Sequence, residues 1–147
     1  MKKESINVYI VDPYEETNTR EMVKRATIAN NWREFAGVIG CNAIDIMEES
    51  CGGITFNIIY DDEFMLNGNN RPSVITADGH PIIGGKIICA GMAYDEESGA
   101  YEDDLTPEQQ HAIFTAAKVG VYQDDSETEY HHALLMIDAV AEGGGND

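Results

Sequence analysis

Apolar and polar residues alternate near the start of the chain, which is the pattern of a half-buried β-strand. Residues 6–11 alternate and are rich in β-branched side chains, and Asp12-Pro13 stops the pattern, so a strand that ends in a turn is predicted. Further strands are predicted where turn residues bound an apolar run. These runs cover residues 41–47, 54–60, 74–76 and 82–92, the last with a bend at Gly84-Gly85.

Spacings near three and four residues predict helices in three other places. Residues 19–35 are predicted to form one or two short helices, because Asn30-Asn31 interrupts their pattern. A second helix is predicted from Thr106, where Pro107 and Gln109 complete a helix start with a capping box. A third is predicted from Ser126. Its apolar stripe would consist of Tyr130, Ala133, Leu134, Ile137 and Ala141.

Together these elements predict an α+β fold: a mainly antiparallel sheet of four to six strands, an N-terminal helical segment and two C-terminal helices. A single domain is expected over residues 1–120, with residues 121–147 forming an acidic helix and tail packed on it. The stripe of the last helix could instead pair with another copy of the chain, so the pattern also allows a homodimer.

Charge limits the classes of partner. The chain has 147 residues, 43% of them hydrophobic, and 27 acidic against 9 basic residues give a net charge of −18. An ordinary nucleic-acid-binding or anionic-membrane-binding protein is excluded, because phosphate surfaces would repel this chain. The acidity is uneven, since residues 87–147 hold 14 acidic residues and only one base, Lys118.

The three cysteines contain no CxxC pair, which indicates reduced thiols in an intracellular protein. No targeting signal is recognised, and no apolar run approaches the roughly 18 residues that a membrane-spanning helix needs. A cytoplasmic location is therefore expected.

The chain carries no recognised catalytic motif, so we expect no catalytic residue, no cofactor and no enzymatic activity. His80 could form a thiol–imidazole pair with Cys41 or Cys89, although thiols inside strands are usually small buried hydrophobes.

A metal site is not expected either. Glu127 with His131 and Glu129 with His132 have helical spacing, but further ligands cannot be placed, and a solvated face is favoured.

Two groups of residues are the candidate binding surface for a partner or ligand. Asp61 to Glu63 follow an apolar strand and are interpreted mainly as a solvated turn. Arg71 would hold that turn in place or recognise a ligand, since guanidinium groups form bidentate pairs. The candidate residues are Asp61, Asp62, Glu63, Asn67, Asn70, Arg71, Asp95, Glu96, Glu97, Glu102, Asp103 and Asp104.

The order of several short motifs between residues 6 and 115 resembles a family of small domains from bacteriophages and mobile elements of Gram-positive and gut bacteria, a family of unknown function. The motifs are the segments 6–13, 37–46, 60–63, 66–68, 70–72, 82–88 and 105–109. The resemblance implies a compact α+β domain of mobile-element origin and supplies no activity and no catalytic residues. The acidic segment after residue 120 lies outside it.

Charge and resemblance together favour a protein that binds another protein with a basic surface. In its sharpest form this is an acidic mimic of DNA that inhibits a host nucleic-acid-binding or defence protein. A domain of this size is about 38 Å across, and duplex DNA of that length carries about 22 charges. The alternative is a domain that binds or sequesters a nucleotide-like ligand, in a pocket that contains Arg71 or Lys86.

Overall fold

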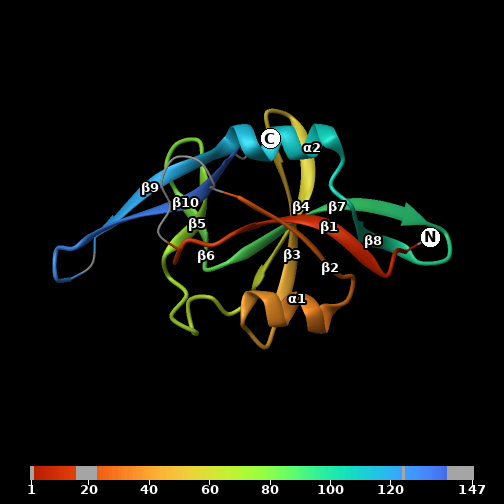
Figure 1. Cartoon of the computed structure of the whole chain (residues 1–147), viewed down its shortest axis with the longest axis horizontal. Helices are drawn as coiled ribbons and strands as arrows, with labels where there is room; N and C mark the ends of the chain where they lie inside the picture. The colour runs from red at the N-terminus through yellow and green to blue at the C-terminus, as the bar shows by residue number, and fades with distance from the viewer. Residues whose placement is uncertain (1, 16–22, 124, 139–147) are drawn as a thin grey trace, which may run out of the picture.

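The computed structural model describes residues 2–15, 23–123 and 125–138. Over these residues the chain forms ten strands and two helices (Figure 1). They are β1 (Ser5–Val11), β2 (Lys24–Ala29), α1 (Trp32–Ile39), β3 (Ile44–Cys51), β4 (Ile54–Asp61), β5 (Pro72–Thr76), β6 (Pro81–Gly84), β7 (Ile87–Asp95), β8 (Gly99–Asp103), α2 (Pro107–Ala116), β9 (Ala117–Gln123) and β10 (Glu129–Ile137).

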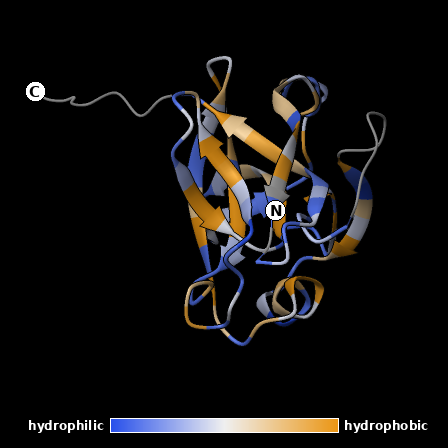
Figure 2. Ribbon diagram, turned by 90° about the vertical axis from the view of Figure 1, so that its left-hand side faces the viewer, coloured by the Kyte–Doolittle hydropathy of each residue, from blue (hydrophilic) through white to orange (hydrophobic). Residues whose placement is uncertain are grey.

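The strands form two sheets. The first has the order β2-β1-β7-β4-β3, all its pairs are antiparallel, and β8 pairs with the second half of β7. The second has the order β6-β5-β10-β9, in which β5 and β10 run parallel. Figure 2 shows that hydrophobic residues concentrate on the strands, whereas the connecting segments are mainly hydrophilic.

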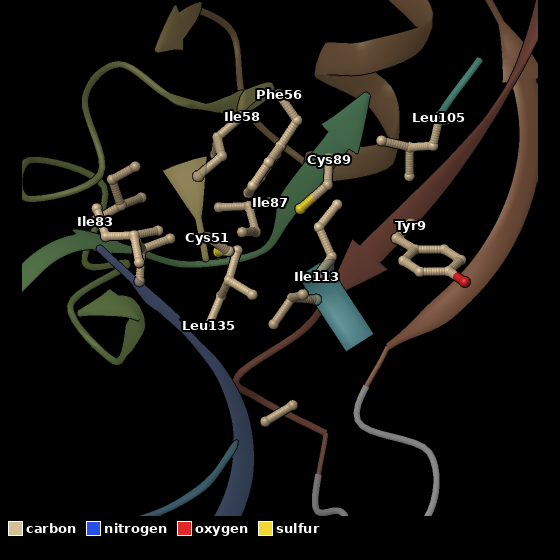
Figure 3. Close-up of a cluster of buried hydrophobic side chains, with 14 residues drawn as sticks. Tyr9, Cys51, Phe56, Ile58, Ile83, Ile87, Cys89, Leu105, Ile113 and Leu135 are labelled. Atoms are coloured by element: carbon tan, nitrogen blue, oxygen red, sulfur yellow. The ribbon is translucent and has the colours of Figure 1, made fainter. Parts of the chain in front are cut away.

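The first sheet is buried on both faces. On one face its side chains pack with Phe35 and Ile39 of α1 in one core cluster. On the other face they pack with α2 and the second sheet, in a cluster that includes Ile113 and Leu135 (Figure 3). The layers are therefore α1, the first sheet, and then the second sheet with α2.

The start of β7 lies at the centre of this arrangement. Its residues Ile87 to Ala90 are all 0% exposed, and alternate members belong to the two different clusters. A strand buried on both faces has a continuous apolar sequence, because both sets of alternate side chains need apolar neighbours.

One carboxylate joins the two sheets at the end of β10. Asp138 accepts hydrogen bonds from the backbone N–H groups of Gly52 (2.8 Å) and Gly53 (2.9 Å) in the β3–β4 turn, and from Ser50 Oγ (3.1 Å). These bonds, that of Gly53 above all, lower the pKa of Asp138. The same contact fixes β10 to the end of the first sheet.

The predicted α+β fold with an N-terminal helical segment and two C-terminal helices is wrong. The described residues are 52% strand and 14% helix, with two sheets instead of one. Of the predicted helices, the one that begins at Thr106 is confirmed, including its capping box and its Pro at the first position. It ends at Ala116, and β9 follows directly.

The third predicted helix is the strand β10, which pairs with β9 and β5. Its stripe of apolar residues fits a helix equally well, but residues 132–135 are buried without a break, as in an interior strand. The proposed boundary at residue 120 falls within β9, and the predicted tail lies outside the described residues.

The first predicted helical segment, residues 19–35, is also wrong in part. Residues 24–29 form the edge strand β2, and the helix α1 begins only at Trp32. The break at Asn30-Asn31 is real, because Asn31 caps α1 by accepting a hydrogen bond from Glu34 N (2.8 Å). Residues 19–22 lie outside the described part of the chain.

The predicted long strand 82–92 is two strands that belong to different sheets, β6 in the second and β7 in the first. Gly85, with φ of +86°, turns the chain between them. Within the described residues, neither helix is long and apolar enough to cross a membrane.

The crossing of β7 and the segment after β8 yields a first prediction. A Cβ atom at Gly91 would lie 2.1 Å from the carbonyl oxygen of Asp104, so Gly91→Ala forces the backbone apart. We expect the free energy of unfolding to fall by about 1–3 kcal/mol in chemical denaturation. The control is Gly37→Ala in α1, where a Cβ meets nothing within 4 Å and stability should rise by about 0.5–1 kcal/mol. Equal effects of the two substitutions would contradict the close approach.

Candidate functional site

A buried carboxylate holds the loop between β4 and β5. Asp61, the last residue of β4, is 0% exposed. Its two oxygens accept hydrogen bonds from Glu63 N (2.9 Å), Asn67 Nδ2 (3.0 and 3.2 Å) and Asn69 Nδ2 (2.7 Å). A carboxylate has about four acceptor positions, so the surrounding donors satisfy this buried group. The interpretation as a solvated turn is wrong for Asp61 but holds for Asp62 and Glu63, which are exposed.

Two glycines let this loop lie against β6. A Cβ at Gly84 would lie 2.1 Å from the carbonyl oxygen of Asn69, and one at Gly85 would lie 2.9 Å from the Asn69 Cβ. The positive φ of Gly85 is itself a conformation that favours glycine. The loop, residues 62–70, is thus fixed from both sides, by the Asp61 hydrogen bonds and by contact with the β6–β7 corner.

The fixed loop exposes two large apolar side chains. Met65 is 78% exposed and Leu66 is 83% exposed, the two highest values among the large exposed hydrophobic residues of the described chain. Beside them lies a groove of about 280 Å³. It is lined by Phe64, Met65, Asn70, Pro72, Pro81, Ile82, Ile83 and Gly84. Met65 and Leu66, which form the tip of this loop, are not among the candidate residues predicted from the sequence. Two consecutive large apolar residues in a polar loop were nevertheless a visible signal.

Arg71 connects the base of this loop to two other parts of the molecule. Its guanidinium carbon lies 5.0 Å from the ring centroids of both Tyr14 and Tyr130, and its Nη1 donates to the carbonyl of Pro13 (3.3 Å). Tyr14 Oη in turn donates to Asn69 Oδ1 (3.4 Å). The side chains that hold the Asp61 turn are therefore asparagines, while Arg71 packs between two aromatic rings.

The second group of candidate residues lies on the β7–β8 hairpin. Asp95 ends β7, Glu96 and Glu97 lie in the turn, and residues 102–104 form the end of β8 and the exit from it. We call residues 95–104 the acidic hairpin, because it carries six carboxylates and no basic residue.

Local contacts partly compensate the negative charge of the acidic hairpin. Lys3 forms a salt bridge with Asp104 and lies 3.7 Å from Asp103, and the Lys3 hydrogen bond lowers the pKa of Asp104. Burial raises the pKa of Glu102, whose Oε2 accepts a hydrogen bond from Asn57 Nδ2 (3.3 Å). The backbone N–H of Ser98 (2.5 Å) lowers the pKa of Asp95.

The two groups lie at opposite ends of β7. In the β4–β7 register Ile59 is opposite Ile88, which places Asp61 beside the start of β7, whereas Asp95 is its last residue. At about 3.4 Å per residue, the two ends are about 30 Å apart along the strand. Figure 1 shows β8 and the β5–β6 region on opposite sides of the molecule. The candidate residues do not form one continuous acidic surface.

Two larger cavities lie elsewhere. One, of about 540 Å³, lies between β1, β2 and the start of α2, and its lining includes Arg25, Thr27 and Asp104. The other, of about 530 Å³, lies between α2, β9 and the β3–β4 turn and is mostly apolar. Neither Arg71 nor Lys86 lines these cavities or the groove beside Met65, so the pocket expected for a nucleotide-like ligand is not found among them.

The residues considered for a thiol–imidazole pair, His80 with Cys41 or Cys89, lie in different parts of the fold. Cys89 is 0% exposed in the core, and burial raises its pKa. Cys41 contacts the Ala43 carbonyl (3.4 Å), and burial raises its pKa too. His80 pairs with Asp78 (3.1 Å) in the β5–β6 turn.

The Glu and His residues between positions 127 and 132 were considered as metal ligands because their spacing would bring them together on a helix. Residues 129–137 form the strand β10, so this spacing does not bring them together. Neighbouring residues of a strand point to opposite faces, and accordingly His131 is exposed while His132 is buried. Within residues 2–15, 23–123 and 125–138, no group of three or more His, Cys, Asp or Glu side chains is placed to hold a metal.

No family model, no curated protein sequence and no solved structure matches this chain. The resemblance to a phage and mobile-element family therefore stays a prediction from the order of its motifs.

The Asp61 cluster generates the second prediction. Asp61→Asn places an amide N–H₂ against the amides of Asn67 and Asn69, so one buried donor loses its acceptor. The cost should be about 1–3 kcal/mol of unfolding free energy, with faster amide exchange at Glu63 and Asn69. Asp62→Asn, an exposed neighbour, is the matched control and should change neither quantity. If both variants behave alike, the buried carboxylate does not hold the loop.

The buried side chain of His132 generates the third prediction. It is 3% exposed, its Nδ1 donates to the Ala133 carbonyl (3.2 Å), and burial, with a smaller effect of Arg71, lowers its pKa below 6.5. Between the native and the unfolded pKa of His132, the unfolded chain therefore binds a proton at this side chain and the native chain does not. Unfolding free energy should fall as pH decreases below about 6.5, by at most about 1.4 kcal/mol per pH unit.

Denaturation at pH 7.0 and at pH 5.5 measures this loss. His132→Gln should reduce the loss, whereas His131→Gln, at the exposed neighbouring position, should retain it. An unchanged pH dependence in His132→Gln would show that other groups cause it.

Proposed function

We propose that this protein acts by binding another protein whose surface is basic, with the 62–70 loop as the apolar anchor of the contact. The observation that carries the proposal is the exposure of Met65 and Leu66 on a loop that a buried carboxylate and two close glycine contacts hold in place.

Exposed apolar side chains are usually scattered, and single ones need no explanation. Here two adjacent ones lie at the tip of a loop whose base has a satisfied, buried polar cluster. A loop fixed before binding loses little conformational entropy when a partner binds it, so more of the contact energy appears as affinity. Full burial of a Leu or Met side chain contributes about 1.5–3 kcal/mol.

The charges around the tip support a basic partner. Asp62 and Glu63 precede Met65 in the loop and are exposed, and residues 62–70 contain no Lys, Arg or His. The net charge of −18 adds long-range attraction toward a cationic surface, which raises association rates and makes binding sensitive to salt.

The narrower proposal, inhibition of a nucleic-acid-binding or defence protein, rests on the same charge and on the resemblance to a mobile-element family. Proteins that bind nucleic acid have basic surfaces that carboxylates can occupy. The acidic hairpin would be a second contact about 30 Å from the loop, which suits a partner with a long basic groove.

The experiment uses immobilised protein to capture partners from bacterial lysate at low and high salt. Three baits are compared: the wild-type chain, the double variant Met65→Ser with Leu66→Ser, and Phe114→Ser. Phe114, 55% exposed on α2 and outside both proposed contacts, is the matched control for loss of an exposed apolar side chain. Captured proteins are then purified, and their affinities are measured by calorimetry.

We expect at least one captured protein to bind the wild-type chain and Phe114→Ser alike, to bind the double variant at least about tenfold more weakly, and to dissociate as salt increases. Competition by duplex DNA would support the inhibitor form. If the double variant binds every captured protein as tightly as the wild-type chain does, the loop is not the anchor.

A further inference from the structure

The edges of the two sheets differ in how they are protected. An unpaired strand edge can pair with another chain, and proteins usually prevent this with charges, prolines or short strands. Among the described edges, β2 carries Lys24 and Arg25, β8 carries Glu102 and Asp103, and β6 has four residues and begins with a proline. The other edge of the first sheet, β3, has charges at Asp45, Glu48 and Glu49.

Beyond Lys118, near its start, the β9 strand lacks this protection. It pairs with β10 on one side, and no described strand pairs with its other side. Its last five residues, Val119 to Gln123, contain no charge and no proline, and Val121 is 59% exposed. The β9–β10 hairpin also projects beyond the other elements of the molecule, so its outer part extends away from the two-sheet core (Figure 1).

We propose that β9 pairs edge to edge with β9 of a second copy of this chain, antiparallel about a two-fold axis beside Gly120 and Val121. The two four-stranded sheets would then form one continuous eight-stranded sheet. Antiparallel pairing of seven-residue strands provides about six backbone hydrogen bonds, and the Val121 side chains of the two copies would meet near the axis.

Charge complementarity favours a second copy in this orientation. Lys118, near the start of β9, is the single base after residue 87, while exposed acids, Asp125 and Glu127, follow the end of the strand. An antiparallel pair places the start of each β9 beside the end of the other. Each Lys118 would therefore lie close to the acidic turn of the opposite copy, which gives two symmetric attractive contacts.

The interface is small and the copies repel at long range. An edge of seven residues buries less than the roughly 1,200 Å² of standard interfaces, so a transient dimer of micromolar or weaker affinity is expected. Because each copy carries −18, salt should strengthen the dimer by screening the repulsion. Binding of a basic partner through the 62–70 loop has the opposite salt dependence, so the two proposals can fail separately.

Sedimentation velocity over a roughly hundredfold range of protein concentration tests the dimer, with amide exchange at low and high concentration to locate the contact. Val121→Lys places two like charges at the axis although it reduces the net charge of each copy. It should raise the dimer dissociation constant at least tenfold. The matched control is Phe114→Lys, a 55% exposed position on α2, which should leave dimerisation unchanged or slightly stronger.

We expect the wild-type chain to dimerise more at high concentration and high salt, with added protection confined to the β9 amides. A monomer over the whole range, or equal effects of Val121→Lys and Phe114→Lys, would overturn the proposal. So would a wild-type monomer whose captured partner loses affinity on Val121→Lys, because β9 would then bind a strand of that partner instead.

Discussion

The fold depends on the burial of β7 on both faces. Four consecutive residues, Ile87 to Ala90, are 0% exposed, so every atom of this segment must be covered by another layer. The helix α1 covers one side, and α2 with the second sheet covers the other. With β7 removed, neither cluster would close and β1 and β4 would lose their common neighbour, because both pair with it. The candidate surfaces at the two ends of β7 are held apart by a strand whose first five residues are all buried.

The same strand explains why the 62–70 loop is ordered without secondary structure of its own. The loop leaves β4 at Asp61 and is pressed against the β6–β7 corner at Gly84 and Gly85, so its position is set by core strands at both contacts. Burying a carboxylate costs several kcal/mol unless donors surround it. Here the donors come from the loop itself, which means that the carboxylate is satisfied only when the loop is in place. The hydrogen bonds and the loop conformation are therefore mutually dependent.

Local signals in the sequence predicted local features well. The capping box at Thr106 and the strands 6–11 and 54–60 depend on neighbouring residues alone, and the structure confirms them. The failures involve long-range pairing. Residues 130–137 fit a helical stripe, but they lie between β5, about 60 residues earlier, and β9, and only the tertiary contacts decide. Likewise, no local pattern distinguishes a buried Asp61 from a solvated one, because its donors lie six and eight residues away.

The positions of the acidic residues limit how the negative charge of this protein can contribute to binding. The loop and the acidic hairpin are about 30 Å apart, which is several Debye lengths at physiological salt. Each surface would therefore interact with a partner almost independently of the other. Net charge would then attract basic partners and raise the association rate, but it cannot select among the many basic proteins of a cell. Selection requires a specific shape, and in the function proposed here the exposed apolar side chains of Met65 and Leu66 would supply it. The acidic residues would bring a partner near, and the fit of two side chains would determine which partner remains bound.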